Sequence, residues 1–139
     1  MNVYKEFCNL INEQRVKYNC GTTEEGASYI NFNVAGKNFS ALNIHIFFDE
    51  EKLATATIRA FQLCKFPEEK NLLLLQTVNN LNYKYRWVTF SATEEGQIVA
   101  GMDVDCEGEN VAARLFRMLE RFLSVVDAAY PNVMKVLYT

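Results

Sequence analysis

The segment DVDCEGE, residues 103–109, carries four acidic side chains in seven positions. Carboxylates this close together can bind a metal ion or act as a general acid and base. The segment begins like an EF-hand calcium loop, but Arg114 occupies the twelfth position, where such a loop needs a bidentate glutamate. The EF-hand pattern is therefore broken. A small metal-dependent hydrolase that uses the acidic strand end, Asp103 to Glu109, remains as an alternative function.

A structural interpretation of these acids is preferred. Asp103 and Asp105 alternate with apolar residues along an expected strand, so they fall on its solvent-exposed face. Glu107 and Glu109 then lie at the start of the next helix, where the helix dipole favours carboxylates. We therefore assign no metal ligand and no catalytic residue to this segment.

Other catalytic patterns are missing from the sequence. His45 is the single histidine, whereas a cysteine or serine nucleophile normally needs an adjacent base. No glycine-rich phosphate loop occurs. The cysteines form no C-x-x-C pair, and we interpret them as free thiols that pack as small buried hydrophobes. They are Cys8, Cys20, Cys64 and Cys106. The sequence predicts a protein that is not an enzyme and binds no cofactor and no metal.

Length and composition indicate one folded domain over residues 1–139, since 50% of the residues are hydrophobic. The net charge of −3 comes without a basic cluster, which argues against nucleic acid as a partner. The longest apolar run, Leu72 to Leu75, is too short to span a bilayer. Lys5 and Glu6 are charged and lie where a signal peptide would have its apolar segment. We expect a cytoplasmic protein that does not bind membranes.

Hydrophobic spacing predicts three helices. The first covers residues 3–17, the second begins at Pro67, and the third runs over residues 109–129 until Pro131 interrupts it. A hairpin over residues 87–106 separates the second helix from the third. Strands and helices in separate runs predict an α+β fold, with helices packed on a mainly antiparallel sheet.

A longer hairpin is expected over residues 42–58, where apolar and polar residues alternate. With a turn at residues 49–51, Ile46 lies opposite Ala54, and one face of the hairpin is apolar throughout. A third strand comes from residues 20–23 or 29–34, which gives the order α-βββ-α-ββ-α.

The other face of this hairpin has a polar centre between apolar ends. The centre contains Asn43, His45, Thr55, Thr57 and Arg59, and the ends are the pairs Phe47 with Leu53 and Phe39 with Phe61. Such a face can hold a peptide or a small ligand, and we assign partner binding to Asn43, His45, Thr57 and Arg59. The alternative is an ordinary solvated sheet face, which antiparallel sheets commonly have.

The last helix is apolar over about half its circumference, more than one sheet contact requires. One of its two apolar stripes must therefore be covered by the first helix or by another subunit. We expect a homodimer whose interface contains Phe116, Leu119, Leu123 and Val126.

The segments LLQTVNNLNYKYRWVTFSATEEGQIVAGMDVD and ENVAARLFRMLERFLSVVDAAYPNVMKVL together resemble the bacterial YbjN-like family. The matching positions are Asn79 and Asn82 in an N-x-x-N stretch, and Asp127 and Pro131 in the last helix. The resemblance implies the fold of type III secretion chaperones and a homodimeric regulator of sensory transduction or chaperone-like binding module. It brings no catalytic residues. Asn82 is interpreted as structural, since its amide can bond nearby backbone.

The preferred function is thus a non-catalytic protein-binding module, chaperone-like or regulatory, that acts as a homodimer on an unidentified protein or peptide.

Overall fold

The structure, a computed structural model, describes residues 2–49 and 54–139. These residues form three α-helices, one short 3₁₀ helix and six strands. In chain order they are α1 (Val3–Glu13), β1 (Asn19–Thr22), β2 (Ser28–Val34), β3 (Leu42–Asp49), β4 (Thr55–Lys65), η1 (Glu68–Lys70), α2 (Asn71–Lys84), β5 (Thr89–Ala92), β6 (Gln97–Asp105) and α3 (Val111–Leu137).

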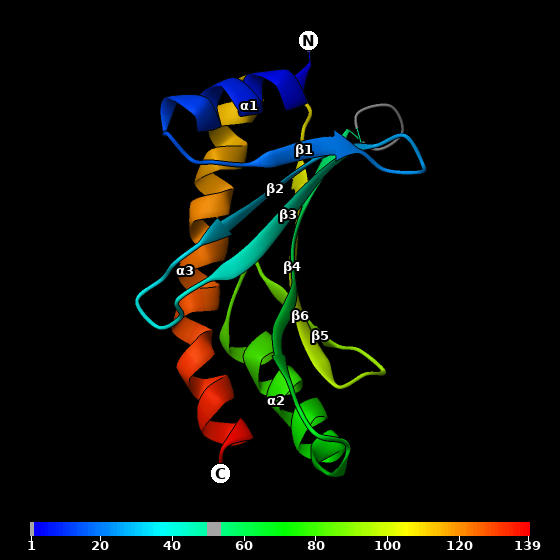
Figure 1. The fold of residues 1–139 in the computed structure, drawn as a ribbon, viewed down its shortest axis with the longest axis vertical. Helices are drawn as coiled ribbons and strands as arrows, with labels where there is room; N and C mark the ends of the chain where they lie inside the picture. The colour runs from blue at the N-terminus through cyan, green and yellow to red at the C-terminus, as the bar shows by residue number, and fades with distance from the viewer. Residues whose placement is uncertain (1, 50–53) are drawn as a thin grey trace.

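The strands form one antiparallel sheet in the order β1-β2-β3-β4-β6-β5. The long helix α3 runs behind the sheet, with α1 at one end of the molecule and α2 at the other (Figure 1). The predicted α+β class is confirmed. Both candidates for an extra strand pair into the sheet, as β1 and β2. Four strands therefore precede α2, where the sequence analysis expected three.

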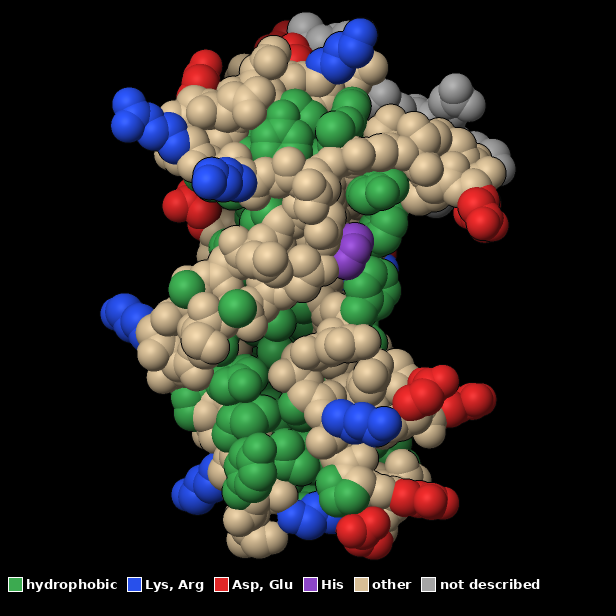
Figure 2. Space-filling model, in the orientation of Figure 1, with side chains coloured by type: hydrophobic (Ala, Val, Ile, Leu, Met, Phe, Trp, Pro, Cys, Tyr) green, Lys and Arg blue, Asp and Glu red, His purple; other side chains and the backbone are tan. Residues whose placement is uncertain are grey.

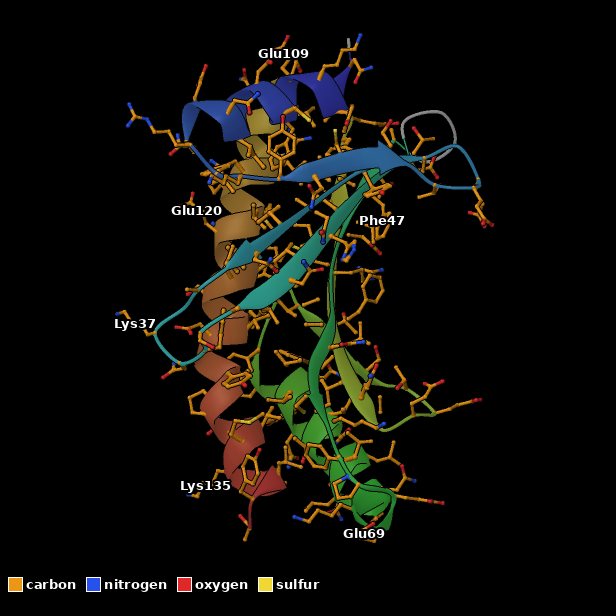
Figure 3. The ribbon with its side chains drawn as sticks, in the orientation of Figure 1. Lys37, Phe47, Glu69, Glu109, Glu120 and Lys135 are labelled. Carbon is orange, nitrogen blue, oxygen red and sulfur yellow. The ribbon has the colours of Figure 1, made fainter. Side chains whose placement is uncertain are left out.

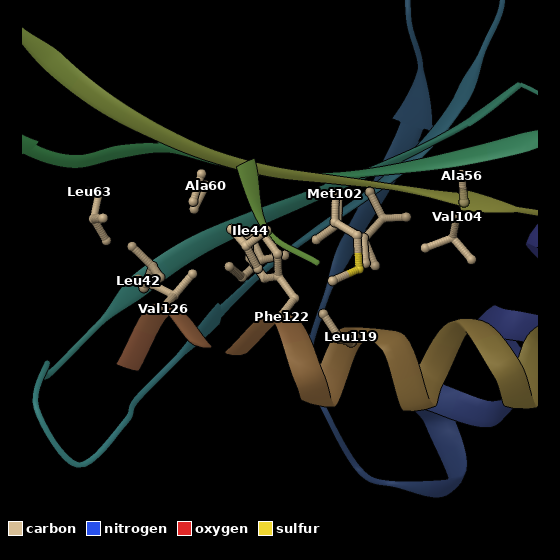
Figure 4. Packing of buried hydrophobic residues seen from close by; sticks show 14 of the residues in the cluster. Leu42, Ile44, Ala56, Ala60, Leu63, Met102, Val104, Leu119, Phe122 and Val126 are labelled. Carbon is tan, nitrogen blue, oxygen red and sulfur yellow. The ribbon is translucent and has the colours of Figure 1, made fainter. Parts of the chain in front are cut away.

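The core lies between the sheet and the helices. In Figure 4, Leu119, Phe122 and Val126 of α3 project toward side chains of β3, β4 and β6. The hairpin of β5 and β6, with the residue that precedes it, contributes an apolar face to this core. Its buried residues are Val88, Phe90, Ile98, Ala100, Met102 and Val104.

The register of the first long hairpin differs from the prediction. Ile46 lies opposite Ile58, four residues further along β4 than the expected Ala54. Residues 50 and 51 of the expected turn lie outside the described residues. A shift of four keeps every side chain on its own face of the sheet, so the apolar pattern is satisfied equally well by both registers.

The first helix begins where expected but ends earlier. Asn2 caps it, because its side-chain oxygen accepts a hydrogen bond from the backbone N of Lys5 at 3.1 Å. The last helical residue is Glu13, four short of the expected end. Arg15 has a left-handed φ of 59°, which cannot continue a right-handed helix.

The last helix continues through Pro131 to Leu137, so the prediction that Pro131 ends it is wrong. Proline has no backbone N–H, and the carbonyl of Asp127, four residues earlier, loses its usual helical donor. Asn38, in the β2–β3 connection, replaces that donor. Its Nδ2 donates to the Asp127 carbonyl oxygen at 2.9 Å, and its backbone N donates to Asp127 Oδ1 at 2.9 Å.

This arrangement predicts that Asn38 and Pro131 are coupled. Asn38→Ala is expected to lower the free energy of unfolding by about 1 kcal/mol, because the Asp127 carbonyl loses its donor. In a Pro131→Ala background, residue 131 regains an N–H for the same carbonyl, so Asn38→Ala should cost less. Urea unfolding of the four proteins in a double-mutant cycle measures the difference. An identical cost in both backgrounds would contradict the coupling.

A side chain of α2 forms hydrogen bonds with the outer edge of strand β5, which lies at the edge of the sheet. Asn82 donates from Nδ2 to the carbonyl oxygen of Phe90 at 2.8 Å, and its Oδ1 accepts from the Phe90 backbone N at 2.8 Å. The amide thus occupies the positions that another strand would use, which protects an exposed sheet edge. The structural interpretation of Asn82 is confirmed.

Candidate functional site

The face of the sheet that points away from the helices carries the residues to which partner binding was assigned. Asn43 and His45 lie on β3, and Thr57 and Arg59 lie on β4. None of the four is buried, whereas the residues between them along each strand are. We call this surface the open face. The observed register sets His45 directly opposite Arg59, a neighbour that the expected register did not give it.

Asparagine side chains form a hydrogen-bonded ladder across β2 and β3 on the open face. Asn31 Nδ2 donates to Asn43 Oδ1 at 2.7 Å, and Asn43 Nδ2 donates to Asn33 Oδ1 at 2.9 Å. The Asn31 amide nitrogen also lies 3.2 Å from His45 Nε2. Burial lowers the pKa of His45. The ladder therefore adjoins an imidazole whose neutral form is favoured.

An aromatic cluster lies beside the ladder. The His45 ring stacks on Phe47, with centroids 5.8 Å apart and an interplanar angle of 7°, and meets Phe61 edge-on at 5.3 Å. Tyr29 extends the cluster through Phe47, at 6.2 Å. Phe47 points away from α3 in Figure 3, and the histidine lies among hydrophobic side chains in Figure 2. Phe61 remains 40% exposed, so the cluster presents apolar surface to a partner.

Arg59 lies across β6 toward Asp103. Its Nη2 is 3.2 Å from Asp103 Oδ1, which also accepts a hydrogen bond from Thr57 Oγ1 at 3.1 Å. Gly101 makes room for this arrangement, because a Cβ at that position would lie 2.6 Å from Arg59 Nη1. The Arg59 side chain is 29% exposed and that of Asp103 is 64% exposed, and partly exposed ion pairs contribute little stability. Arg59 Nη1 also donates to the Ile58 carbonyl oxygen at 2.9 Å, which holds the guanidinium in place beside Asp103.

A cavity of about 230 Å³ opens next to Arg59, over β5 and β6. Gly101 and Asp103 of β6 line it together with Trp87, which precedes β5. Trp87 has a left-handed φ of 74°, and the guanidinium of Arg121 lies 5.1 Å from its ring centroid. The open face thus combines an aromatic cluster, an amide ladder, a cation and a cavity.

The two apolar pairs that were expected to flank the polar centre are not found as predicted. Phe39 is buried on the helical side of the sheet, where its ring centroid is 5.7 Å from that of Tyr130. It therefore does not pair with Phe61. Phe47 pairs with Thr57, and Leu53, its expected partner, lies outside the described residues.

Sequence reasoning missed Tyr29, Gly101 and Trp87 as parts of the open face. Tyr29 has the same alternation as Asn31 and could have been found once β2 was paired with β3. Gly101 and Trp87 carried no comparable signal, because their role depends on how β5 and β6 lie beside β4.

The acidic segment is organised by Arg114. Its Nη2 donates to the carbonyl oxygens of Asp105 and Glu107, at 2.8 and 2.7 Å. The Asp105 carboxylate accepts from the Glu107 backbone N at 3.1 Å. Within residues 2–49 and 54–139, no group of three or more Asp, Glu, Cys or His side chains is arranged so that it could hold a metal ion. Glu107 and Glu109 precede α3, whose N-cap is Asn110 and whose first turn contains no acid, so both lie just before the helix and not within it.

The cysteine thiols are poor nucleophiles where burial is substantial. Burial raises the pKa of Cys64 to about 11 and also raises the pKa of Cys8. A thiol with a raised pKa stays protonated near neutral pH and reacts slowly. Cys20 is exposed on β1, contrary to the expectation that the cysteines pack as buried hydrophobes.

The stripe of α3 expected at a dimer interface is covered in large part by the chain itself. Leu119 is 4% exposed and Val126 0%, because both pack against the sheet. Phe116 is half-buried and lies against Phe7 of α1, with ring centroids 6.5 Å apart. Burial removes the reason for expecting Leu119 and Val126 at an interface. An interface role of Phe116 and Leu123, which is also half-buried, stays a prediction.

Across the described ranges, no helix combines the length and apolar composition needed to cross a bilayer. A search of curated proteins finds no match to the chain. The sequence model of the YbjN family, described as a putative bacterial sensory transduction regulator, matches residues 46–134. That match covers more than half of the chain, from within β3 to within α3. The resemblance inferred from the sequence is thereby confirmed, and the chain belongs to the YbjN family.

Proposed function

We propose that this protein is a non-catalytic, chaperone-like or regulatory binding module that holds a protein or peptide on its open face and acts as a homodimer in the cytoplasm. The family description supports a regulatory role. The type III secretion chaperone-like fold implied by the sequence resemblance is part of this proposal.

The observation that carries the proposal is the aromatic cluster of Tyr29, His45, Phe47 and Phe61 on a sheet face that none of the described helices covers. Contiguous apolar surface rimmed by polar groups marks interaction sites in soluble proteins. Aromatic residues and arginine are also the residue types that contribute most to protein interfaces.

The surroundings of the cluster suit an extended peptide. Asn33 and Asn43 are exposed, and their amides offer both donors and acceptors to a peptide backbone. Arg59 provides a cation on the other side, next to the cavity of about 230 Å³ that could take one side chain. Apolar contact then supplies affinity, and the polar groups set orientation.

This proposal predicts that Arg59→Glu weakens capture of the partner while the fold is retained. The substitution reverses the positive charge of Arg59 beside the cluster, and it places two carboxylates together at Asp103. Because the original ion pair is partly exposed, we expect a stability loss of about 1 kcal/mol. The measurement is the yield of proteins recovered with immobilised chain from native cell extract.

The matched control is Arg117→Glu, the same charge reversal at an exposed position of α3. Recovered proteins should fall severalfold with Arg59→Glu and with Phe61→Ser, and stay constant with Arg117→Glu. Circular dichroism and urea unfolding establish that each variant is folded. If both open-face variants recover the same proteins as the unchanged chain, the open face is an ordinary solvated face.

A further inference from the structure

One cysteine of α1 and one of β1 lie in the same layer, where the helix runs alongside the edge strand (Figure 1). Cys20 on β1 pairs with Ile30, which is buried on the helical side of the sheet. Paired residues of an antiparallel ladder share a face, so the Cys20 thiol projects toward the helices. Cys8 is one helical turn after Tyr4, whose ring meets Phe48 edge-on at 5.4 Å. Both thiols therefore lie between α1 and the sheet.

A tyrosine hydroxyl connects the two thiols. Burial and interactions with the thiols of Cys20 and Cys8 raise the pKa of Tyr4, so the Tyr4 hydroxyl lies close to both sulfur atoms. Burial also raises the pKa of Cys8, and a negative charge on Cys20 raises it further, as expected of two neighbouring thiols. Side chains that contact the same hydroxyl can meet one another by rotation about their Cα–Cβ bonds.

The two thiols differ in exposure, which suits them to different steps of an oxidation. Cys20 is exposed, whereas Cys8 is half-buried. An exposed thiol is the one that a dissolved oxidant reaches first. Burial keeps Cys8 protonated, but the hydroxyls of Tyr18 and Tyr4 act in the opposite direction and lower its pKa, because they stabilise its thiolate. Cys8 is thus a second thiol beside the accessible one, with two hydroxyls that assist the loss of its proton.

We propose that Cys20 and Cys8 form an oxidation site that reacts with a peroxide and closes to a disulfide. The Cys20 thiolate attacks one oxygen of hydrogen peroxide. An S–O bond forms, the O–O bond breaks, and the departing hydroxide takes up a proton and leaves as water. The Cys8 sulfur then loses its proton and attacks the Cys20 sulfur, so that an S–S bond forms, the S–O bond breaks and a second water leaves. The peroxide gains the two electrons that the two thiols lose.

The disulfide ties α1 to an edge strand of the sheet. It closes a loop over residues 8–20 and so restricts separation of the helix from the strand. In a reducing compartment the two residues rest as thiols, and the disulfide is transient. The site lies on the opposite side of the sheet from Asn31 and the rest of the open face, so the inference does not depend on the proposed function.

The experiment treats the reduced full chain with hydrogen peroxide and counts its free thiols. Two of the four thiols should be lost, and the intact mass should fall by the mass of two hydrogen atoms. Trypsin cleaves after Arg15 and Lys17, between the two cysteines, so peptides 6–15 and 18–37 should be recovered as one linked species. A dithiol reductant should separate these peptides and restore all four thiols.

Serine variants assign the two roles. Cys8→Ser removes the second thiol, so a sulfenic acid should persist at Cys20 and be trapped there by dimedone, an adduct that the unchanged chain should barely form. Cys20→Ser should lose the linked peptides and retain its other thiols. The matched control, Cys64→Ser on β4, should form the link as the unchanged chain does. Circular dichroism establishes that each variant is folded, and the exposed Cys20 tests the site even if Cys8→Ser does not fold.

A second control separates the fold from closeness in sequence. In urea the same peroxide should give a mixture of pairings, because all four thiols then compete. Three results would overturn the inference. They are a folded chain that keeps four free thiols, a disulfide that joins another pair or two chains, and a link between Cys8 and Cys20 that forms as readily in urea as in the folded protein.

Discussion

Replacing Gly96 with alanine is expected to lower the free energy of unfolding by about 3 kcal/mol or more, the sum of backbone strain and a clash with backbone. Gly96 has a φ of 83°, in the left-handed region that residues with a Cβ rarely adopt. A Cβ there would lie 2.6 Å from the Phe66 carbonyl oxygen, which is backbone and cannot rotate away.

The clash would displace the backbone of Phe66, which lies in the connection between β4 and α2. The Phe66 backbone N donates to the Gly96 carbonyl oxygen at 2.8 Å, and the Phe66 side chain is 1% exposed. Moving this backbone to accommodate alanine disturbs both the hydrogen bond and the packing of the ring. Urea unfolding monitored by circular dichroism gives the change in free energy.

Gly26→Ala is the matched control for strain alone. Its φ is 90°, but nothing lies within 4 Å of the added Cβ. This substitution should cost only about 1–2 kcal/mol, the penalty of a left-handed conformation. Equal losses at the two positions would show that the contact with Phe66 has no part in the effect.

The second large effect is expected at Leu119. Leu119→Glu should leave the protein unfolded or nearly so, because the side chain is 4% exposed and packs between α3 and the sheet. A buried carboxylate without a partner costs more than the several kcal/mol of net stability that a domain of this size has. Circular dichroism and sedimentation together show whether any folded species remains.

Ala113→Glu, on the exposed side of the same helix, is the control and should unfold at the same urea concentration as the unchanged chain. A folded monomer produced by Leu119→Glu from a dimeric parent would contradict this prediction. That result would place Leu119 at an interface between subunits, as its apolar spacing alone predicts.

The sequence by itself determined which side of each strand in the first hairpin faces the core. Period-two alternation placed Asn43, His45, Thr57 and Arg59 on one face of the first hairpin, because successive residues of a strand point to opposite sides. The Asn2 cap and the left-handed φ of Gly96 also follow from local rules, since both depend on hydrogen bonds and dihedral angles within a few residues.

Only the tertiary structure decided which residues meet across elements. The pairing of His45 with Arg59 could not be derived, since registers that differ by an even number of residues give the same alternation. Pro131 ends a helix according to local rules, but Asn38, 93 positions earlier in the chain, supplies the donor that lets α3 continue. Leu119 was assigned to an interface because apolar spacing cannot say which surface covers a stripe. In the fold, the six-stranded sheet of the same chain covers it.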